Sequence, residues 1–72
     1  MAFNSEQLEN WFTYHACTPE DLPRFVAIRD AALAFAKVIV ENSPPSADQT
    51  VAIRKVREAV MVANAAIACG GK

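Results

Sequence analysis

One short segment, Ser43-Pro44-Pro45-Ser46, separates two long stretches in which apolar residues recur with helical spacing. The stretch before it has apolar residues at alternating intervals of three and four: Phe25, Ile28, Ala32, Phe35 and Ile39. The stretch after it repeats that spacing: Ile53, Val56, Val60, Ala63 and Ile67. Such spacing places each set on one face of an α-helix. Because a proline pair ends a helix and a short connection makes two helices antiparallel, the pattern predicts an all-α fold built on a long helical hairpin.

Capping signals predict that the two long helices span about residues 19–42 and 46–69. Thr18 followed by proline is a typical helix start, since proline is tolerated at the first helical position. The sequence S-A-D-Q that begins at Ser46 matches a capping box. The two glycines that begin at Gly70 suit the left-handed end of a helix. We expect residues 1–72 to form a single helical-hairpin domain.

A third, shorter helix is expected at about residues 5–12, with Asn4 or Ser5 as its N-cap. One face of this helix is apolar: Leu8, Trp11 and Phe12. A helix of this length is marginal in water, so it must dock on other parts of the chain. We therefore interpret its two aromatic side chains as core residues in preference to ligand-stacking rings.

The composition argues against several classes of protein. Seven Lys and Arg stand against eight Asp and Glu, whereas a protein that binds a nucleic-acid polymer carries a basic surface. Two cysteines outside any CxxC pair, with one histidine, are too few for a disulfide framework or a zinc site. The N-terminus lacks the features of a secretory signal, and the longest uncharged run, residues 59–71, is too short to span a bilayer. We expect a cytoplasmic protein without metal, cofactor or membrane segment.

The predicted helices carry more apolar surface than a hairpin can cover, since apolar residues make up 53% of the chain. The first long helix has a second stripe, which one arginine interrupts: Val26, Arg29, Leu33, Ala36 and Val40. The last helix ends in AVMVANAAIAC, where Asn64 is the one polar side chain and is expected to make an interhelical hydrogen bond. A helix that is apolar all round is buried all round. We therefore expect homo-oligomerisation to cover these faces.

Few residues of the chain are suited to chemistry. Tyr14 and His15 follow the first helix, where an aromatic ring can stack on a flat ligand or act as a half-buried plug, and the sequence leaves both open. His15 and Cys17 make a poor nucleophile pair, because no third group orients them and no oxyanion donors lie nearby. Cys69 ends an apolar run and resembles a small buried hydrophobe. We expect no catalytic residues and no enzyme activity.

Two arginines in the first half of the helix expected at residues 19–42 are candidate anion ligands. Arg29 interrupts an apolar stripe, where a buried guanidinium needs a partner. That partner is a carboxylate, from Asp30, Glu20 or another subunit, or a phosphate, which arginine binds through two hydrogen bonds. Arg24 lies at a helix N-terminus, which favours phosphate, although a solvated side chain is the simpler interpretation.

Four segments together resemble one known family: the Tyr14-His15 pair, AIR at 27–29, VIVENSPPS at 38–46 and AVMVANAAIA at 59–68. They resemble the small phage anti-CBASS cyclic-nucleotide sponges, whose hairpin domain also occurs in phage anti-Thoeris sponges. The resemblance covers residues 12–68, and EAVMVANAAIA is its most specific part.

The resemblance implies a compact homo-oligomer, a homohexamer built from dimers. It also implies that cyclic dinucleotides such as 3′,3′-cGAMP bind in pockets between subunits, while some members hold cyclic trinucleotides on threefold axes. Members of the family sequester the signal without cleaving it, so the host CBASS effector is not activated. The implied role is phage immune evasion in the cytoplasm of the infected bacterium.

Matching positions give the expected ligand-binding residues. Tyr14 matches a tyrosine that stacks on a purine, and Arg29 matches a basic residue on a ligand phosphate. His15 keeps the tyrosine–histidine pair, and Arg24 completes the expected site.

The chain departs from the family pattern at several positions. Ala16 follows the tyrosine–histidine pair where proline is usual, Leu33 replaces a common lysine, and Val62 replaces a common tryptophan. Cys69 stands where an arginine usually follows AIA, and Ala31 stands where a hydroxyl residue is usual. In the family these last two positions serve the trinucleotide pocket. The departures predict that the protein binds dinucleotides but binds trinucleotides poorly or not at all.

A structural or protein-binding hairpin that inhibits a host protein is the alternative interpretation. It shares every feature of composition, but it gives no reason for Tyr14 and Arg29 to act together. A sample that binds no nucleotide yet retains a host protein would favour it.

Overall fold

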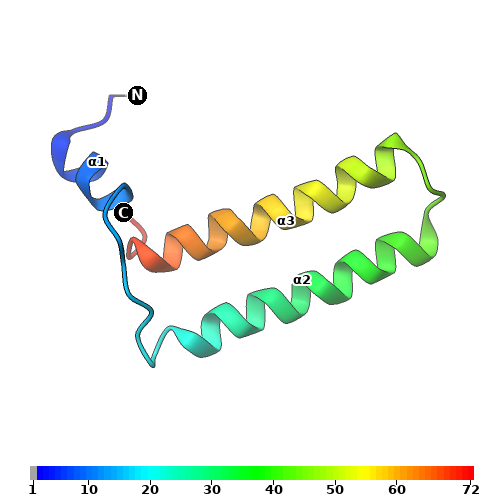
Figure 1. Cartoon of the computed structure of the whole chain (residues 1–72), viewed down its shortest axis with the longest axis horizontal. Coiled ribbons are helices and arrows are strands. Elements are labelled where there is room, and N and C mark those ends of the chain that lie inside the picture. The colour runs from blue at the N-terminus through cyan, green and yellow to red at the C-terminus, as the bar shows by residue number, and fades with distance from the viewer. Residues whose placement is uncertain (1) are drawn as a thin grey trace.

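The computed structural model describes residues 2–72, which form three α-helices and, within that range, no β-strand. The helices are α1 (Ser5–Trp11), α2 (Leu22–Asn42) and α3 (Ala47–Ala68). α2 and α3 run antiparallel, and α1 lies beside the C-terminal end of α3 at the open end of the hairpin (Figure 1). The protomer measures 45 × 32 × 16 Å. The all-α class and the hairpin were both predicted from the sequence.

Both ends of α3 use the predicted capping residues. The Ser46 Oγ accepts a hydrogen bond from the Gln49 main-chain N–H at 3.1 Å. The Gln49 side chain serves the turn rather than a complete capping box, since its Nε2 donates to the main-chain O and the Oγ of Ser43 at 3.0 and 3.1 Å. At the other end, Gly70 and Gly71 have φ angles of 66° and 76°. This left-handed backbone suits glycine and closes the last turn of the helix.

α2 begins at Leu22, later than the predicted start at residue 19. Thr18 caps only a single turn, in which the Asp21 N–H lies 3.3 Å from its Oγ1 and 3.0 Å from its carbonyl oxygen. Pro23 is the physical reason. A helix that began at Pro19 would need an N–H at residue 23 to bond to the residue 19 carbonyl, and proline has none. When α2 begins at Leu22, Pro23 falls in the first turn, where no such bond is required.

Side chains hold α1 at both ends. Asn4 is its N-cap, because its Oδ1 accepts the N–H three residues further on at 2.8 Å. At the other end, the Asn10 Nδ2 donates to the Cys69 carbonyl oxygen at 3.2 Å. The Trp11 Nε1 donates to the Lys72 main-chain oxygen, also at 3.2 Å. These two bonds attach α1 to the segment that follows α3, which provides the expected docking.

The facing stripes of α2 and α3 pack against each other along the hairpin. The predicted stripe of α3 is half-buried along its whole length, and the predicted stripe of α2 is half-buried except at Phe35. None of residues 2–72 is fully buried. A single layer of two helices cannot enclose its side chains, since each helix has a long neighbour on one side only.

Large apolar side chains therefore remain on the surface of the protomer, against the expectation that the aromatic side chains of α1 are core residues. Trp11 is 45% exposed and Phe12 is 84% exposed, so neither is a core residue of the protomer. Met61 and Val62 lie in the run whose faces homo-oligomerisation is expected to cover, and both are more than half exposed in the protomer. The cause is that α2 covers one side of α3 while α1 sits only beside its end (Figure 1). Each helix of the described chain is too short or too polar to cross a membrane.

The interhelical hydrogen bond expected for Asn64 is not formed within the protomer. Its Oδ1 is enclosed and has no hydrogen-bond partner among residues 2–72. The stripe of α2 that packs against α3 consists of apolar side chains, which offer no donor. An enclosed carbonyl oxygen without a donor costs about 1–3 kcal/mol, so the isolated protomer leaves the Asn64 side chain short of one hydrogen bond.

Candidate functional site

Tyr14 lies on the linker between α1 and α2, where it is 88% exposed. Its ring is therefore not the half-buried plug that the sequence left open. A solvent-facing ring presents its faces to a flat ligand, and stacking of one base on such a ring contributes about 1–3 kcal/mol. The position suits a residue that contacts a nucleobase.

His15 is half-buried and turns back toward α1. Its Nε2 lies 2.6 Å from the main-chain oxygen of Asn10. Because a carbonyl oxygen only accepts hydrogen bonds, Nε2 carries the proton in this contact. The Nδ1 atom is left to interact with other groups. The contact also satisfies one of the last carbonyls of α1, which have no partner within the helix.

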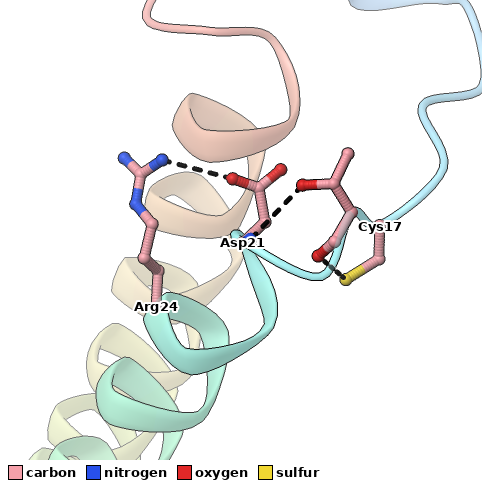
Figure 2. A network of polar contacts seen from close by, with 4 residues as sticks. Cys17, Asp21 and Arg24 are labelled. Atoms are coloured by element: carbon pink, nitrogen blue, oxygen red, sulfur yellow. Dashed lines mark hydrogen bonds and ion pairs between the residues drawn. The ribbon is translucent and has the colours of Figure 1, made fainter.

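Arg24 is engaged by a carboxylate at the start of α2. Its Nη1 lies 3.3 Å from the Asp21 Oδ1, and the Arg24 side chain remains 62% exposed. Figure 2 shows the guanidinium beside the Asp21 carboxylate, with the Cys17 side chain on the other side of Asp21. A phosphate that binds Arg24 must displace this carboxylate or share the guanidinium with it.

Arg29 is exposed on α2 and takes part in no ion pair within residues 2–72. Neither Asp30 nor Glu20, its expected intrachain partners, neutralises it. The expectation of a buried guanidinium is therefore wrong for the protomer, because the face of α2 that carries Arg29 has no neighbour to cover it. The side chain is free to bind an anion or a carboxylate from outside the protomer.

A single protomer does not assemble these residues into one pocket. Arg24 and Arg29 are separated by about 140° around the helix and about 7.5 Å along it, so they occupy different faces of α2. Across the described residues, no hydrogen bond or ion pair joins any two of the four candidates. A ligand that contacts all of them must lie across the junction of the linker and α2 or be contacted by a second subunit.

Two grooves on α3 have apolar linings. A groove of about 650 Å³ lies between the end of α1 and α3 and is lined mainly by Trp11, Phe12, Met61 and Val62. A groove of about 700 Å³ between α2 and α3 is lined mainly by Ile28, Phe35, Val56, Val60 and alanines. Both volumes fall within the range of about 300–1,000 Å³ seen for ligand pockets. None of the four candidates lines either groove, and the linings suit apolar side chains rather than phosphates.

The cysteines and the histidine do not form the pairing considered from the sequence. Cys17 is exposed, and its Sγ lies 3.5 Å from the Thr18 carbonyl oxygen. His15 and Cys69 instead both approach the Asn10 carbonyl oxygen, at 2.6 and 3.9 Å. In the part of the chain that the structure describes, no cluster of three His, Cys, Asp or Glu side chains is suited to a metal ion.

The model of the Acb2/Tad1 hairpin domain matches residues 4–68, which include the linker and both long helices. The chain belongs to the Acb2/Tad1 hairpin-domain family. This is the family that the sequence motifs resemble, and membership implies the general role of a phage cyclic-nucleotide sponge. No curated protein and no solved structure matches the chain.

Asn10 is the residue of this Acb2/Tad1 hairpin that sequence reasoning missed. Its side chain donates a hydrogen bond to the Cys69 carbonyl oxygen, and its own carbonyl oxygen accepts one from the His15 ring. The asparagine side chain competes for backbone hydrogen bonds and asparagine is a weak helix former, so its place near the end of a short helix is its one signal in the sequence. The partner of its side chain is the main-chain carbonyl of Cys69, and a main-chain group leaves no signature in a sequence.

Proposed function

We propose that this protein binds cyclic dinucleotides, such as 3′,3′-cGAMP, and sequesters them without cleavage. The CBASS effector in the cytoplasm of the infected bacterium is then not activated. The observation that carries the proposal is the family match over residues 4–68, a range that includes the exposed ring of Tyr14 and the unpaired guanidinium of Arg29. Sequestration needs no nucleophile, general base or metal. It needs a site that releases its ligand slowly.

The four candidate residues offer the contacts that a cyclic dinucleotide requires. Tyr14 stacks on a purine, and Arg29 forms a charge-assisted hydrogen bond with a phosphate. His15 can add a contact through Nδ1, since Nε2 is already used by Asn10. Arg24 serves as a second phosphate ligand once Asp21 has been displaced.

We further propose that the protein is a homo-oligomer, a hexamer, with its ligand pockets between subunits. The protomer supports this through its exposed apolar side chains and the lack of any buried residue within residues 2–72. Symmetric association of identical copies can cover such surfaces. Pockets that a second subunit completes also fit the separation of Arg24 from Arg29 around α2.

Native mass spectrometry of the purified protein with 3′,3′-cGAMP tests both proposals. We expect one closed oligomer that gains a fixed number of ligands, each recovered with unchanged mass after the protein is denatured. The recovered nucleotide should activate a purified CBASS effector as fully as untreated nucleotide does. Recovery of a linear product would show an enzyme. A folded assembly that retains no cyclic nucleotide but retains a host protein would favour a protein-binding hairpin.

The ligand proposal extends to size discrimination. Cys69 and Ala31 stand at the positions that serve the trinucleotide pocket in the family, and neither side chain supplies a cation or a hydroxyl group. We expect calorimetry to show weak or no binding of a cyclic trinucleotide to a sample that binds the dinucleotide. Comparable affinity for the trinucleotide, unaffected by added dinucleotide, would overturn this expectation.

A further inference from the structure

Three segments of the chain meet at Asn10. Its Nδ2 donates to the Cys69 carbonyl oxygen at 3.2 Å, which links α1 to the end of α3. Its own carbonyl oxygen lies 2.6 Å from the His15 Nε2, which links α1 to the linker. The Cys69 Sγ lies 3.9 Å from the same oxygen. Asn10 is half-buried, and it is the one residue of α1 that contacts both segments in this way.

Trp11 adds a second attachment beside the first. Its indole Nε1 donates to the Lys72 main-chain oxygen at 3.2 Å. The Phe3 ring packs edge-on against the indole, with ring centroids 5.1 Å apart and an interplanar angle of 66°. We call the contacts of Asn10 and Trp11 with residues 69–72 the C-terminal latch. A helix as short as α1 is marginal in water, so these contacts help to keep it formed and in place.

The linker that carries Tyr14 is tied to α1 on both sides of that residue. Thr13 donates through Oγ1 to the Glu9 carbonyl oxygen. His15 donates through Nε2 to the Asn10 carbonyl oxygen. Both acceptors lie in the last turn of α1, where helix carbonyls have no partner within the helix. The backbone of Tyr14 is therefore held between two anchored neighbours while its ring faces solvent.

The position of Tyr14 consequently depends on where α1 is docked. If the C-terminal latch opens, α1 is no longer fixed relative to α3, and the two hydrogen bonds that tie the linker to α1 no longer fix the linker relative to α3. The Tyr14 ring is exposed, so packing around the ring itself does not hold it in place. A ring that must be ordered on binding lowers affinity, because the loss of side-chain and loop freedom opposes association.

We infer that Asn10 is a positioning residue for ligand binding, which acts through the C-terminal latch to hold Tyr14 in its binding position. The inference rests on the proposed function, since Tyr14 is the ring proposed to stack on the nucleotide. Asn10 itself does not need to touch the ligand. Its effect is to reduce the ordering that binding would otherwise require.

Two readouts on the full chain test this inference. Calorimetry with 3′,3′-cGAMP measures affinity, and the emission of Trp11, the only tryptophan of the chain, reports whether the latch is closed. In Asn10→Ala we expect binding weakened roughly 2- to 13-fold, from the ordering of one group. We also expect Trp11 emission at longer wavelength in the free protein and a return toward the wild-type wavelength at ligand saturation. Asn10→Gln retains an amide donor and should recover part of the affinity.

Asn42→Ala is the matched control, because the Asn42 Nδ2 donates to the Val38 carbonyl oxygen at 2.8 Å near the turn of the hairpin. We expect it to leave both readouts unchanged. If Asn10→Ala loses its helical content or its assembly, the similarly shaped Asn10→Asp, which lacks the amide donor, is measured against the same outcomes. A shifted Trp11 emission with unchanged affinity overturns the inference alone. A wild-type protein that binds no cyclic nucleotide overturns the proposed function and the inference with it.

Discussion

Arg24 and Asp21 form an ion pair across the first turn of α2, with the Arg24 Nη1 3.3 Å from the Asp21 Oδ1. Their spacing of three residues makes them neighbours on the helix surface. The Arg24 side chain is 62% exposed, and a solvent-accessible pair of this kind contributes only about 0.2–1 kcal/mol, so a ligand phosphate can displace the carboxylate. The pair therefore keeps Arg24 near the start of α2 while leaving it available to an anion.

Asp21→Asn is expected to strengthen dinucleotide binding up to roughly 5-fold, because the ligand no longer competes with a carboxylate. The helix start should be unaffected, since asparagine is as good an N-cap as aspartate and Asp21 makes no side-chain capping bond. Calorimetry at two salt concentrations measures the change. The gain should shrink at high salt, where exposed charges are screened.

Glu58→Gln is the control for that measurement. It releases Lys55 from an ion pair of the same spacing on α3, at 3.9 Å. This substitution changes net charge by the same amount, so it separates a local effect at Arg24 from a general electrostatic one. Equal gains from both substitutions, or no gain from Asp21→Asn, would show that Arg24 does not contact the ligand.

Replacement of Tyr14 tests the stacking role. Tyr14→Ala should weaken dinucleotide binding roughly 5- to 150-fold, which corresponds to the loss of one base–ring contact. Because Tyr14 is 88% exposed in the protomer, the unfolding temperature of the ligand-free protein should change little. Tyr14→Phe keeps the ring and should bind nearly as well as wild type in the same titration. If Tyr14→Phe is as weak as Tyr14→Ala, the hydroxyl group carries the contact and stacking does not.

Replacement of Arg29 tests the phosphate contact. Arg29→Ala should weaken binding roughly 10- to 150-fold, the range for a hydrogen bond to a charged group, while native mass spectrometry shows an unchanged oligomer. Arg54→Ala removes another exposed arginine, on α3, and should leave affinity unchanged. Loss of the assembly without loss of intrinsic affinity would make Arg29 an interface ion pair instead.

The hairpin could be predicted because local chemistry decides it. The apolar spacing, the proline pair, the Ser46 cap and the glycines after α3 each act within a few residues, and each appears in the structure as expected. The start of α2 differs from the prediction because Pro23 would lie beyond the first turn of a helix that began at residue 19, where its missing N–H leaves a helix carbonyl unpaired. That missing bond also is local, so a stricter count of helix donors would have placed the start correctly.

The surroundings of α1 could not be predicted, because they depend on contacts distant in sequence. Asn10 reaches Cys69 and Trp11 reaches Lys72 through main-chain oxygens, which any residue type could supply. The burial expected for Phe12 assumed that an apolar face finds cover within the chain, and the protomer leaves it 84% exposed. Periodicity identifies which face needs cover but does not say what covers it.

The effect of Asn64→Ala on the stability of the oligomer is informative through its direction. Its Oδ1 is enclosed without a donor in the protomer, and buried polar atoms of native proteins are nearly always paired. We expect the Asn64 amide to turn on assembly, so that its oxygen accepts a hydrogen bond from a neighbouring subunit in the proposed oligomer. Asn64→Ala should then lower the stability of the oligomer by about 1–3 kcal/mol. Its unfolding temperature should fall, and it should dissociate at higher protein concentration than wild type does.

Thermal unfolding and native mass spectrometry over a dilution series measure this effect, with Asn42→Ala as control. The Asn42 amide bonds within its own helix, so its loss should change the two measurements little. A more stable Asn64→Ala oligomer would mean that the Oδ1 atom stays unpaired after assembly, because removing an unpaired enclosed oxygen relieves its desolvation penalty. The direction of the change therefore decides whether Asn64 lies at a hydrogen-bonded subunit contact.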